Sequence, residues 1–143
     1  MTPPSQDTAR LVIPSDPKRI AEADEFLEDL LRRHGIPESL VMDLAIVTSE
    51  LVNNAIVHGN RGDAAKTVSL SVKINRDKVV IRVSDEGEGF DPAAIPDPLA
   101  NENLLREVGR GVFIVRSLMD DVRFERGPAG QTTVEVSKRL TSD

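Results

Sequence analysis

Residues 50–55 of this chain read Glu-Leu-Val-Asn-Asn-Ala, and they lie in a segment that would be apolar almost all round a helix. Pro37 and the two residues after it are typical of a helix start, and Gly59-Asn60 are typical of a helix stop. The pattern therefore predicts a long helix over residues 37–58 that leaves little polar surface.

Glu50, Asn54 and His58 are spaced four residues apart in this helix. Residues four apart are separated by about 40° around a helix, so the three form one narrow polar strip. One interpretation is that the strip faces solvent, because a buried carboxylate without a partner is costly. The other is chemical: the Asn54 amide oxygen suits Mg²⁺, and Glu50 accepts a proton from the group that attacks a terminal phosphate. His58 is typical of a packing or helix-end residue and is left out of the catalytic set.

A second polar segment, residues 85–89, reads Asp-Glu-Gly-Glu-Gly and follows an apolar strand. The Asp85 carboxylate can accept a hydrogen bond from the exocyclic amine of adenine, and Gly87 and Gly89 let the backbone pass close to the base. Taken alone, the same pattern also describes an ordinary tight turn.

The third segment, Gly109-Arg110-Gly111, precedes a predicted helix over residues 111–119. Free backbone N–H groups at a helix N-terminus form a ready phosphate site, and glycines permit unusual backbone angles there. Arg110 either adds a charge to the phosphates or points into water. Neither glycine segment matches the P-loop or the dinucleotide-binding turn. In this order, the three segments together predict an ATP site.

The rest of the sequence predicts helices that alternate with antiparallel strand pairs. We expect residues 1–8 to be a polar tail and residues 9–143 to form a single α+β domain, a two-layer α/β sandwich. Its mixed, mostly antiparallel sheet would carry helices on one face. Before the long helix we expect an edge strand at 9–13 and a helix whose N-cap lies in Ser15-Asp16-Pro17 and which runs to Gly35. After it we expect a hairpin of strands 67–74 and 78–85, an irregular stretch at 90–108, and strands at 122–124 and 132–136.

Composition sets further bounds. The chain has 143 residues, no cysteine and a formal net charge of −6. Disulfides and thiolate metal sites are therefore excluded, and an acidic balance disfavours direct binding of nucleic acid. The N-terminus lacks the features of a signal peptide, and no apolar stretch is expected to approach the length of a membrane span. We therefore expect a soluble, cytoplasmic protein with no membrane contact.

The combination of Glu50 and Asn54 with the 85–89 and 109–111 segments resembles the N, G1 and G2 boxes of the GHKL ATPase superfamily. The resemblance covers nearly the whole chain, and it is closest to the bacterial anti-sigma factor serine/threonine kinases. It implies a Bergerat ATP-binding fold with an ATP lid at about residues 90–108. It also implies Asn54 on Mg²⁺, Glu50 as the base, and Asp85 on adenine.

The resemblance further implies a hydroxyl from Thr132 or Thr133 near the base, and strand register decides which of the two faces the pocket. The implied activity is transfer of phosphate from ATP to a STAS-domain anti-anti-sigma protein, with a sigma factor as alternative partner and a homodimer as the assembly. Two other hypotheses remain open. One is a nucleotide-gated binding module without phosphotransfer, and the other is a scaffold that binds no nucleotide.

Overall fold

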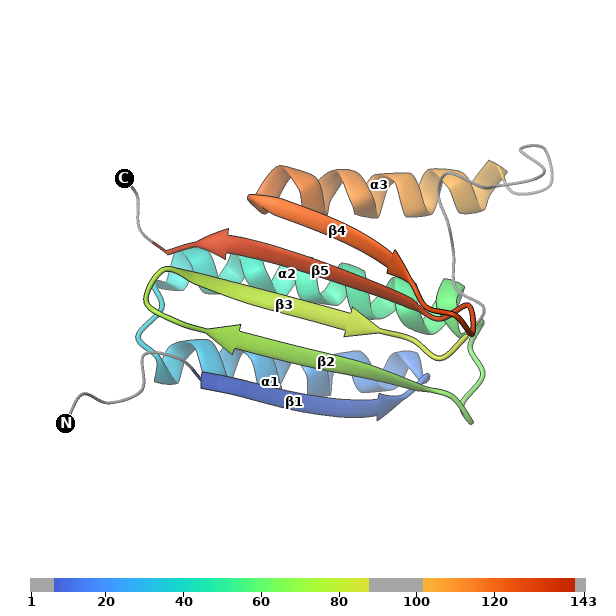
Figure 1. Cartoon of the computed structure of the whole chain (residues 1–143), viewed down its shortest axis with the longest axis horizontal. Coiled ribbons are helices and arrows are strands. Elements are labelled where there is room, and N and C mark those ends of the chain that lie inside the picture. The colour runs from blue at the N-terminus through green and yellow to red at the C-terminus, as the bar shows by residue number, and fades with distance from the viewer. Residues whose placement is uncertain (1–6, 88–101, 141–143) are drawn as a thin grey trace.

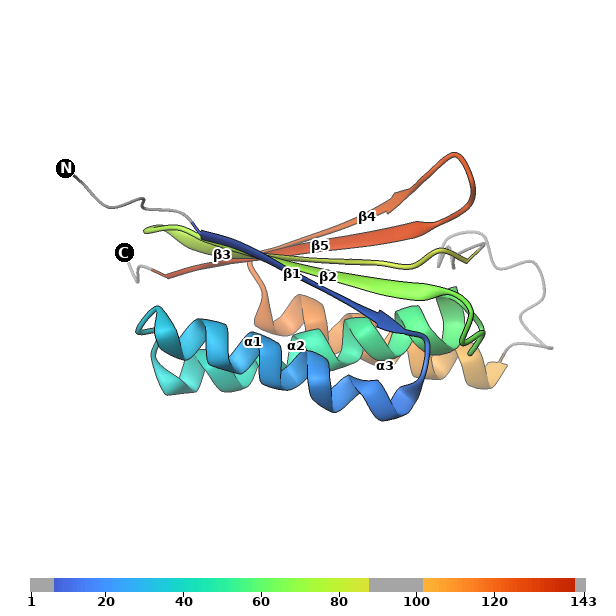
Figure 2. The ribbon, with the colours of Figure 1, turned by 90° about the horizontal axis from the view of Figure 1, so that it is seen from below.

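The structure is a computed structural model that describes residues 7–87 and 102–140. Five strands form one sheet in the order β1-β2-β3-β5-β4. The three α-helices cover a single face of this sheet and leave the other face open, as the edge-on view shows (Figure 2). The predicted two-layer sandwich is confirmed.

The elements follow one another along the chain in an order that places two helices between the first and second strands (Figure 1). Their bounds are β1 Asp7–Pro14, a 3₁₀ turn Pro17–Arg19, α1 Ile20–Arg33, α2 Glu38–Asn54, a π-helical turn Ala55–Gly59, β2 Thr67–Ile74, β3 Lys78–Ser84, α3 Glu102–Leu118, β4 Asp121–Arg126 and β5 Thr132–Arg139.

The predicted edge strand and hairpin are both present. β1 lies at one edge of the sheet and pairs only with β2, and β2 and β3 form the hairpin. Asn75 sets the hairpin turn, because its side-chain oxygen accepts the N–H groups of Asp77 at 2.8 Å and Lys78 at 2.9 Å. All four strand pairings are antiparallel, so the expectation of a mixed sheet is wrong for the described strands.

The sheet separates an apolar face from a polar face by the alternation of side chains along each strand. On β2, Val68, Leu70 and Val72 are buried against the helices, whereas Ser69, Ser71 and Lys73 lie on the open face. The buried core is built from aliphatic side chains. One helical layer is therefore enough to cover the apolar side of the sheet.

α2 is the central helix of that layer. Together with the π-helical turn it spans 22 residues, long and apolar enough to cross a membrane by length and composition alone, which corrects the expectation from the sequence. Its side chains Val41, Leu44 and Val47 are fully buried in the domain core. The apolarity of α2 is therefore that of a core helix between α1, α3 and the sheet.

α3 begins at Glu102, not at Gly111 as predicted. Residues 102–107 are mostly good helix formers, and a glycine inside a helix costs only about 1 kcal/mol relative to alanine. Gly109 and Gly111 therefore lie within the helix. Packing of α3 against α2 offsets this cost, since tertiary contacts outweigh local propensity.

Candidate functional site

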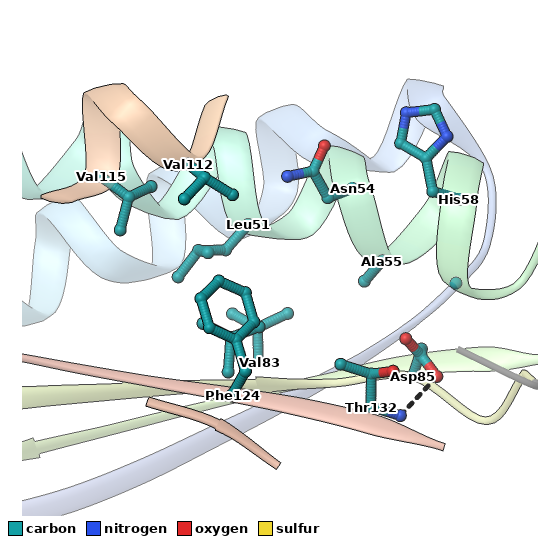
Figure 3. Close-up of a pocket in the computed structure, with 12 residues that line it drawn as sticks. Leu51, Asn54, Ala55, His58, Val83, Asp85, Val112, Val115, Phe124 and Thr132 are labelled. Carbon is teal, nitrogen blue, oxygen red and sulfur yellow. Dashed lines mark hydrogen bonds between the residues drawn. The ribbon is translucent and has the colours of Figure 1, made fainter. Parts of the chain in front are cut away.

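A cavity of about 40 Å³ lies between the helices and the sheet at the C-terminal end of α2. Figure 3 shows Asp85 and Thr132 together on the sheet side, with Ala55 of the π-helical turn above them and Leu51 of α2 on the side of Val83 and Phe124. Most of the lining surface is apolar. The lining residues are Leu51, Asn54, Ala55, His58, Gly59, Val83, Asp85, Val112, Val115, Phe124, Thr132 and Val134.

Asp85 is the buried carboxylate of this pocket, with only 6 % of its surface exposed. It follows β3 directly, and its Oδ1 accepts the backbone N–H of Thr132 at 3.0 Å (Figure 3). Its own N–H donates to the Thr132 carbonyl at 3.0 Å. Burial raises the pKa of Asp85, and the N–H groups of Thr132 and Gly87 oppose this rise. The carboxylate is therefore fixed in place by the neighbouring strand.

Two glycines allow the π-helical turn after α2 to touch the loop after β3. A Cβ at Gly59 would lie 2.1 Å from Asp85 Oδ2, and a Cβ at Gly87 would lie 1.8 Å from the Gly59 carbonyl oxygen. Neither contact leaves room for a side chain. Glycine at both positions is therefore what permits the Asp85 carboxylate to lie against the helix end.

The two candidate hydroxyls, Thr132 and Thr133, lie on opposite faces of β5. Thr132 is buried and lines the pocket. Thr133 pairs with Ser84, and the two hydroxyl oxygens are 2.9 Å apart on the open face of the sheet. Strand register therefore makes Thr132 the candidate for the pocket and directs Thr133 away from it.

Glu50 and Asn54 lie on the side of α2 that faces α3. Both are half-buried, and Asn54 lines the pocket whereas Glu50 does not. A Cβ at Gly111 would lie 2.8 Å from Glu50 Oε2 and 3.4 Å from Asn54 Nδ2, so α3 passes directly over the polar strip. Within residues 7–87 and 102–140, neither side chain takes part in a hydrogen bond or ion pair.

The third polar segment lies in the interior of α3. Gly109 and Arg110 are exposed, and Gly111 is buried against α2. Because α3 begins at Glu102, the backbone N–H groups of these residues are not those of a helix N-terminus. The expected ready-made phosphate site is therefore not formed. Gly89 and residues 90–101 of the expected lid lie outside the described residues, and residues 102–108 belong to α3.

Several pocket residues were not singled out from the sequence. His58, set aside above, lines the pocket beside Gly59. Phe124 projects from β4 onto the same cavity, with the Arg116 guanidinium carbon 5.9 Å from its ring centroid. Alternation of apolar and polar residues along β4 could have indicated Phe124. Its cross-strand partner Val134 lines the same pocket.

The oxygen donors near the pocket fit a cation that is shared with a ligand. No group of three or more His, Cys, Asp or Glu side chains gathers in the part of the chain that the structure describes. Asn54 offers a neutral amide oxygen, and Glu50 offers a carboxylate one turn away. Mg²⁺ suits such a sparse set, since it keeps several waters and takes other ligands from phosphates.

Comparison with known proteins identifies the family of the domain. The family model described as "Histidine kinase-like ATPase domain" matches residues 13–138. The serine-protein kinase RsbW of Staphylococcus epidermidis is 32% identical over 125 residues, covering 82% of this chain and 79% of the relative. RsbW of Listeria innocua is 28% identical over 123 residues, covering 82% and 78%.

Solved structures share the fold. The crystal structure of the RsbU and RsbW domains of a Mycobacterium tuberculosis protein matches with a TM-score of 0.67 and 20% identity, covering 96% of this chain and 33% of that one. The SiaB–SiaC complex from Pseudomonas aeruginosa matches with a TM-score of 0.55 and 16% identity, covering 92% and 89%. The family expected from the sequence is thus confirmed, and the chain belongs to the histidine kinase-like ATPase domain family, of GHKL type.

Proposed function

We propose that this chain is a cytoplasmic serine/threonine kinase that uses ATP and Mg²⁺ to phosphorylate a STAS-domain anti-anti-sigma protein. The observation that carries the proposal is the convergence of Asp85, Thr132 and Asn54 on one apolar pocket. Similarity to serine-protein kinases over 82% of the chain supports the reaction type. A sigma factor is the alternative partner, and the chain works as a homodimer without direct contact with nucleic acid or membrane.

The sheet side of the pocket suits adenine. Asp85 carries the acceptor for the exocyclic amine, since Oδ1 is held by Thr132 and Oδ2 lies beside Gly59. Apolar side chains of α2 and the sheet surround this carboxylate and would contact the faces of the base. A base that offers an N–H donor therefore pairs with an acceptor that is already in position.

The helix side suits the terminal phosphate. Mg²⁺, with Asn54 as its protein ligand, would neutralise charge on the phosphate oxygens. The hydroxyl oxygen of the partner's Ser or Thr forms a bond to the γ-phosphorus, and the bond from that phosphorus to the bridging oxygen breaks, releasing ADP. Glu50 accepts the hydroxyl proton. Arg110 and the backbone of Gly109 and Gly111 would bind phosphate once the first turns of α3 open.

The small volume of the cavity means that α3 has to open before a nucleotide can bind. The cavity of about 40 Å³ is far smaller than the roughly 300–1,000 Å³ of pockets that hold small molecules. Gly111 lies over Glu50 and Asn54 and is the part of α3 that covers the helix side. Nucleotide binding therefore moves this part of α3 away from the polar strip.

A calorimetric titration with ATP–Mg²⁺ tests the pocket. Wild-type protein freed of nucleotide should bind in the micromolar range, about 8 kcal/mol, and Asp85→Asn should abolish binding. Thr133→Ala is the matched control, because its hydroxyl lies on the open face of the sheet, and it should bind as wild type does. No heat from folded wild type would leave only the scaffold hypothesis.

Phosphotransfer to a purified STAS-domain protein tests the reaction. Glu50→Ala should keep ATP binding and lose transfer, because Glu50 does not line the pocket that would hold the base. The nucleotide-gated module would be favoured by two results together. Wild type would transfer no phosphate, and Glu50→Ala would keep both ATP binding and the change in partner affinity that ATP causes.

A further inference from the structure

Asn60 is a fully buried amide just beyond the π-helical turn, with 1 % of its surface exposed. From the sequence it reads only as the end of a helix. Its side chain lies outside the pocket lining, yet every polar atom of the amide has a hydrogen-bond partner. A buried polar side chain with all partners in place is a strong structural constraint, since losing one partner leaves a desolvated group behind.

Asn60 joins segments that are far apart in the sequence. Its Nδ2 donates to Ser15 Oγ at 2.7 Å, just after β1, and to the Thr67 carbonyl at 2.9 Å, at the start of β2. Its backbone N–H donates to the Ala55 carbonyl at 2.8 Å and so closes the π-helical turn. These contacts anchor the amide to both layers of the domain.

The remaining contact reaches the proposed adenine site. Asn60 Oδ1 accepts the backbone N–H of Glu86 at 2.9 Å. That N–H belongs to the peptide unit that joins Asp85 to Glu86, and a peptide unit is planar, so fixing it also fixes the Asp85 carbonyl. Thr67 also holds this segment, because its hydroxyl donates to the Glu86 carboxylate at 2.7 Å.

We propose that Asn60 is a positioning residue that sets selectivity for the adenine base, by holding the Asp85–Glu86 peptide so that the Asp85 carboxylate faces the exocyclic amine. The inference rests on the proposed function, because it assigns Asp85 to adenine. Without the Asn60 oxygen, the Glu86 N–H loses its partner, and the peptide after Asp85 is no longer held by its own N–H. The remaining contacts are those of Asp85 with the Thr132 backbone, of the Glu86 side chain with Thr67, and of Gly87 with Gly59.

A purely structural Asn60 makes a different prediction. If the amide only holds the fold together, its loss weakens every purine nucleotide equally. If it positions Asp85, its loss weakens ATP more than a nucleotide that has no exocyclic amine. Purine riboside triphosphate is such a nucleotide, and the ratio of its Kd to that of ATP measures the interaction with Asp85.

The experiment measures both Kd values for wild type, Asn60→Ala and Ser15→Ala. Wild type should prefer ATP by about tenfold or more, as expected for a hydrogen bond to a charged group. Asn60→Ala should bring the ratio to within about twofold of unity. Ser15→Ala is the matched control, because it removes a partner of Nδ2 and leaves the Glu86 contact in place. It should lower the Tm and keep the wild-type ratio.

An unchanged ratio in folded Asn60→Ala, or a lost ratio in Ser15→Ala, would overturn the inference while leaving the kinase proposal intact. Wild type that binds neither nucleotide would instead overturn the proposed function itself. Amide exchange in the wild type covers the case in which Asn60→Ala does not fold. The Glu86 amide should exchange slowly, and exchange as fast as that of an open loop would contradict the bond to Asn60.

Discussion

The two ends of the proposed nucleotide site differ in how completely they are built. The base end comprises Asp85 and the residues that hold it: Gly59, Asn60, Glu86, Gly87 and Thr132. Hydrogen bonds of 2.9–3.0 Å and direct backbone contacts fix its parts. At the phosphate end, which comprises Glu50, Asn54 and residues 109–111, the two polar side chains of α2 lie under α3, which would have to open for the proposed reaction.

Under the proposed function, this difference means that the two ends act at different times. The base end is organised when the domain folds, so it can select the nucleotide before any rearrangement. The phosphate end is completed only when α3 moves, so that Glu50 and Asn54 become available after the nucleotide has arrived. Each of the following substitutions tests one side of that contrast.

Gly87→Ala should have the largest effect. The new Cβ would lie 1.8 Å from the backbone oxygen of Gly59, where no flexible side chain can move aside. We expect a loss of about 3 kcal/mol or more in the free energy of unfolding, the upper range for overpacking, together with loss of ATP binding. Urea denaturation measures the first and calorimetry the second. A variant as stable as wild type would show that the base end is not rigid.

The second largest effect should be the pH dependence that Asp85 gives to the stability of the domain. Burial raises its pKa above 3.8, against the opposing hydrogen bonds and the charges of Arg126 and Lys66. The folded state therefore holds the proton more tightly than the unfolded state does. The contribution of Asp85 to stability is full below the unfolded pKa and is lost as pH rises through the folded pKa.

Wild type should thus lose stability relative to Asp85→Asn from about pH 4 upward, and the gap should become constant above the folded pKa. Each unit of pKa elevation corresponds to about 1.4 kcal/mol. Urea denaturation of both proteins over that range gives the difference. If wild type instead gained stability relative to Asp85→Asn with rising pH, the hydrogen bonds to Asp85 would lower its pKa more than burial raises it.

Gly109→Ala should have the smallest effect, and its direction is opposite for stability and for binding. A Cβ at Gly109 would meet no atom within 4 Å, so alanine should stabilise α3 by about 1 kcal/mol. If ATP binds only when this part of α3 opens, affinity should fall by about fivefold. Urea denaturation and calorimetry measure the two changes. A stabilised variant with unchanged affinity would mean that the nucleotide binds with α3 intact.

Elements with a strong local period were predictable. The β2–β3 hairpin and α2 follow directly from alternation and from helical spacing of apolar residues. The start of α3 was not, because two glycines look like a helix boundary when packing against α2 is unknown. Local pattern alone fails where tertiary contacts compensate for poor propensity.

The site shows the same limit. Asp85 and Asn54 were selected by residue type and spacing, and both line the pocket. The choice between Thr132 and Thr133 needed strand register, which one residue of slip would reverse. Asn60 carried no local signal, because its partners Ser15 and Glu86 lie 45 and 26 residues away in the sequence.

Phe124, on the wall of the pocket, has a spectroscopic consequence. The chain contains no Trp and no Tyr, so it has almost no intrinsic fluorescence of its own. Phe124 is 37 % exposed and shares the cavity with Val112 and Val115 of α3. Phe124→Trp would place a single emitting indole where the two layers meet, and its emission would follow the displacement of α3 in real time against a dark background.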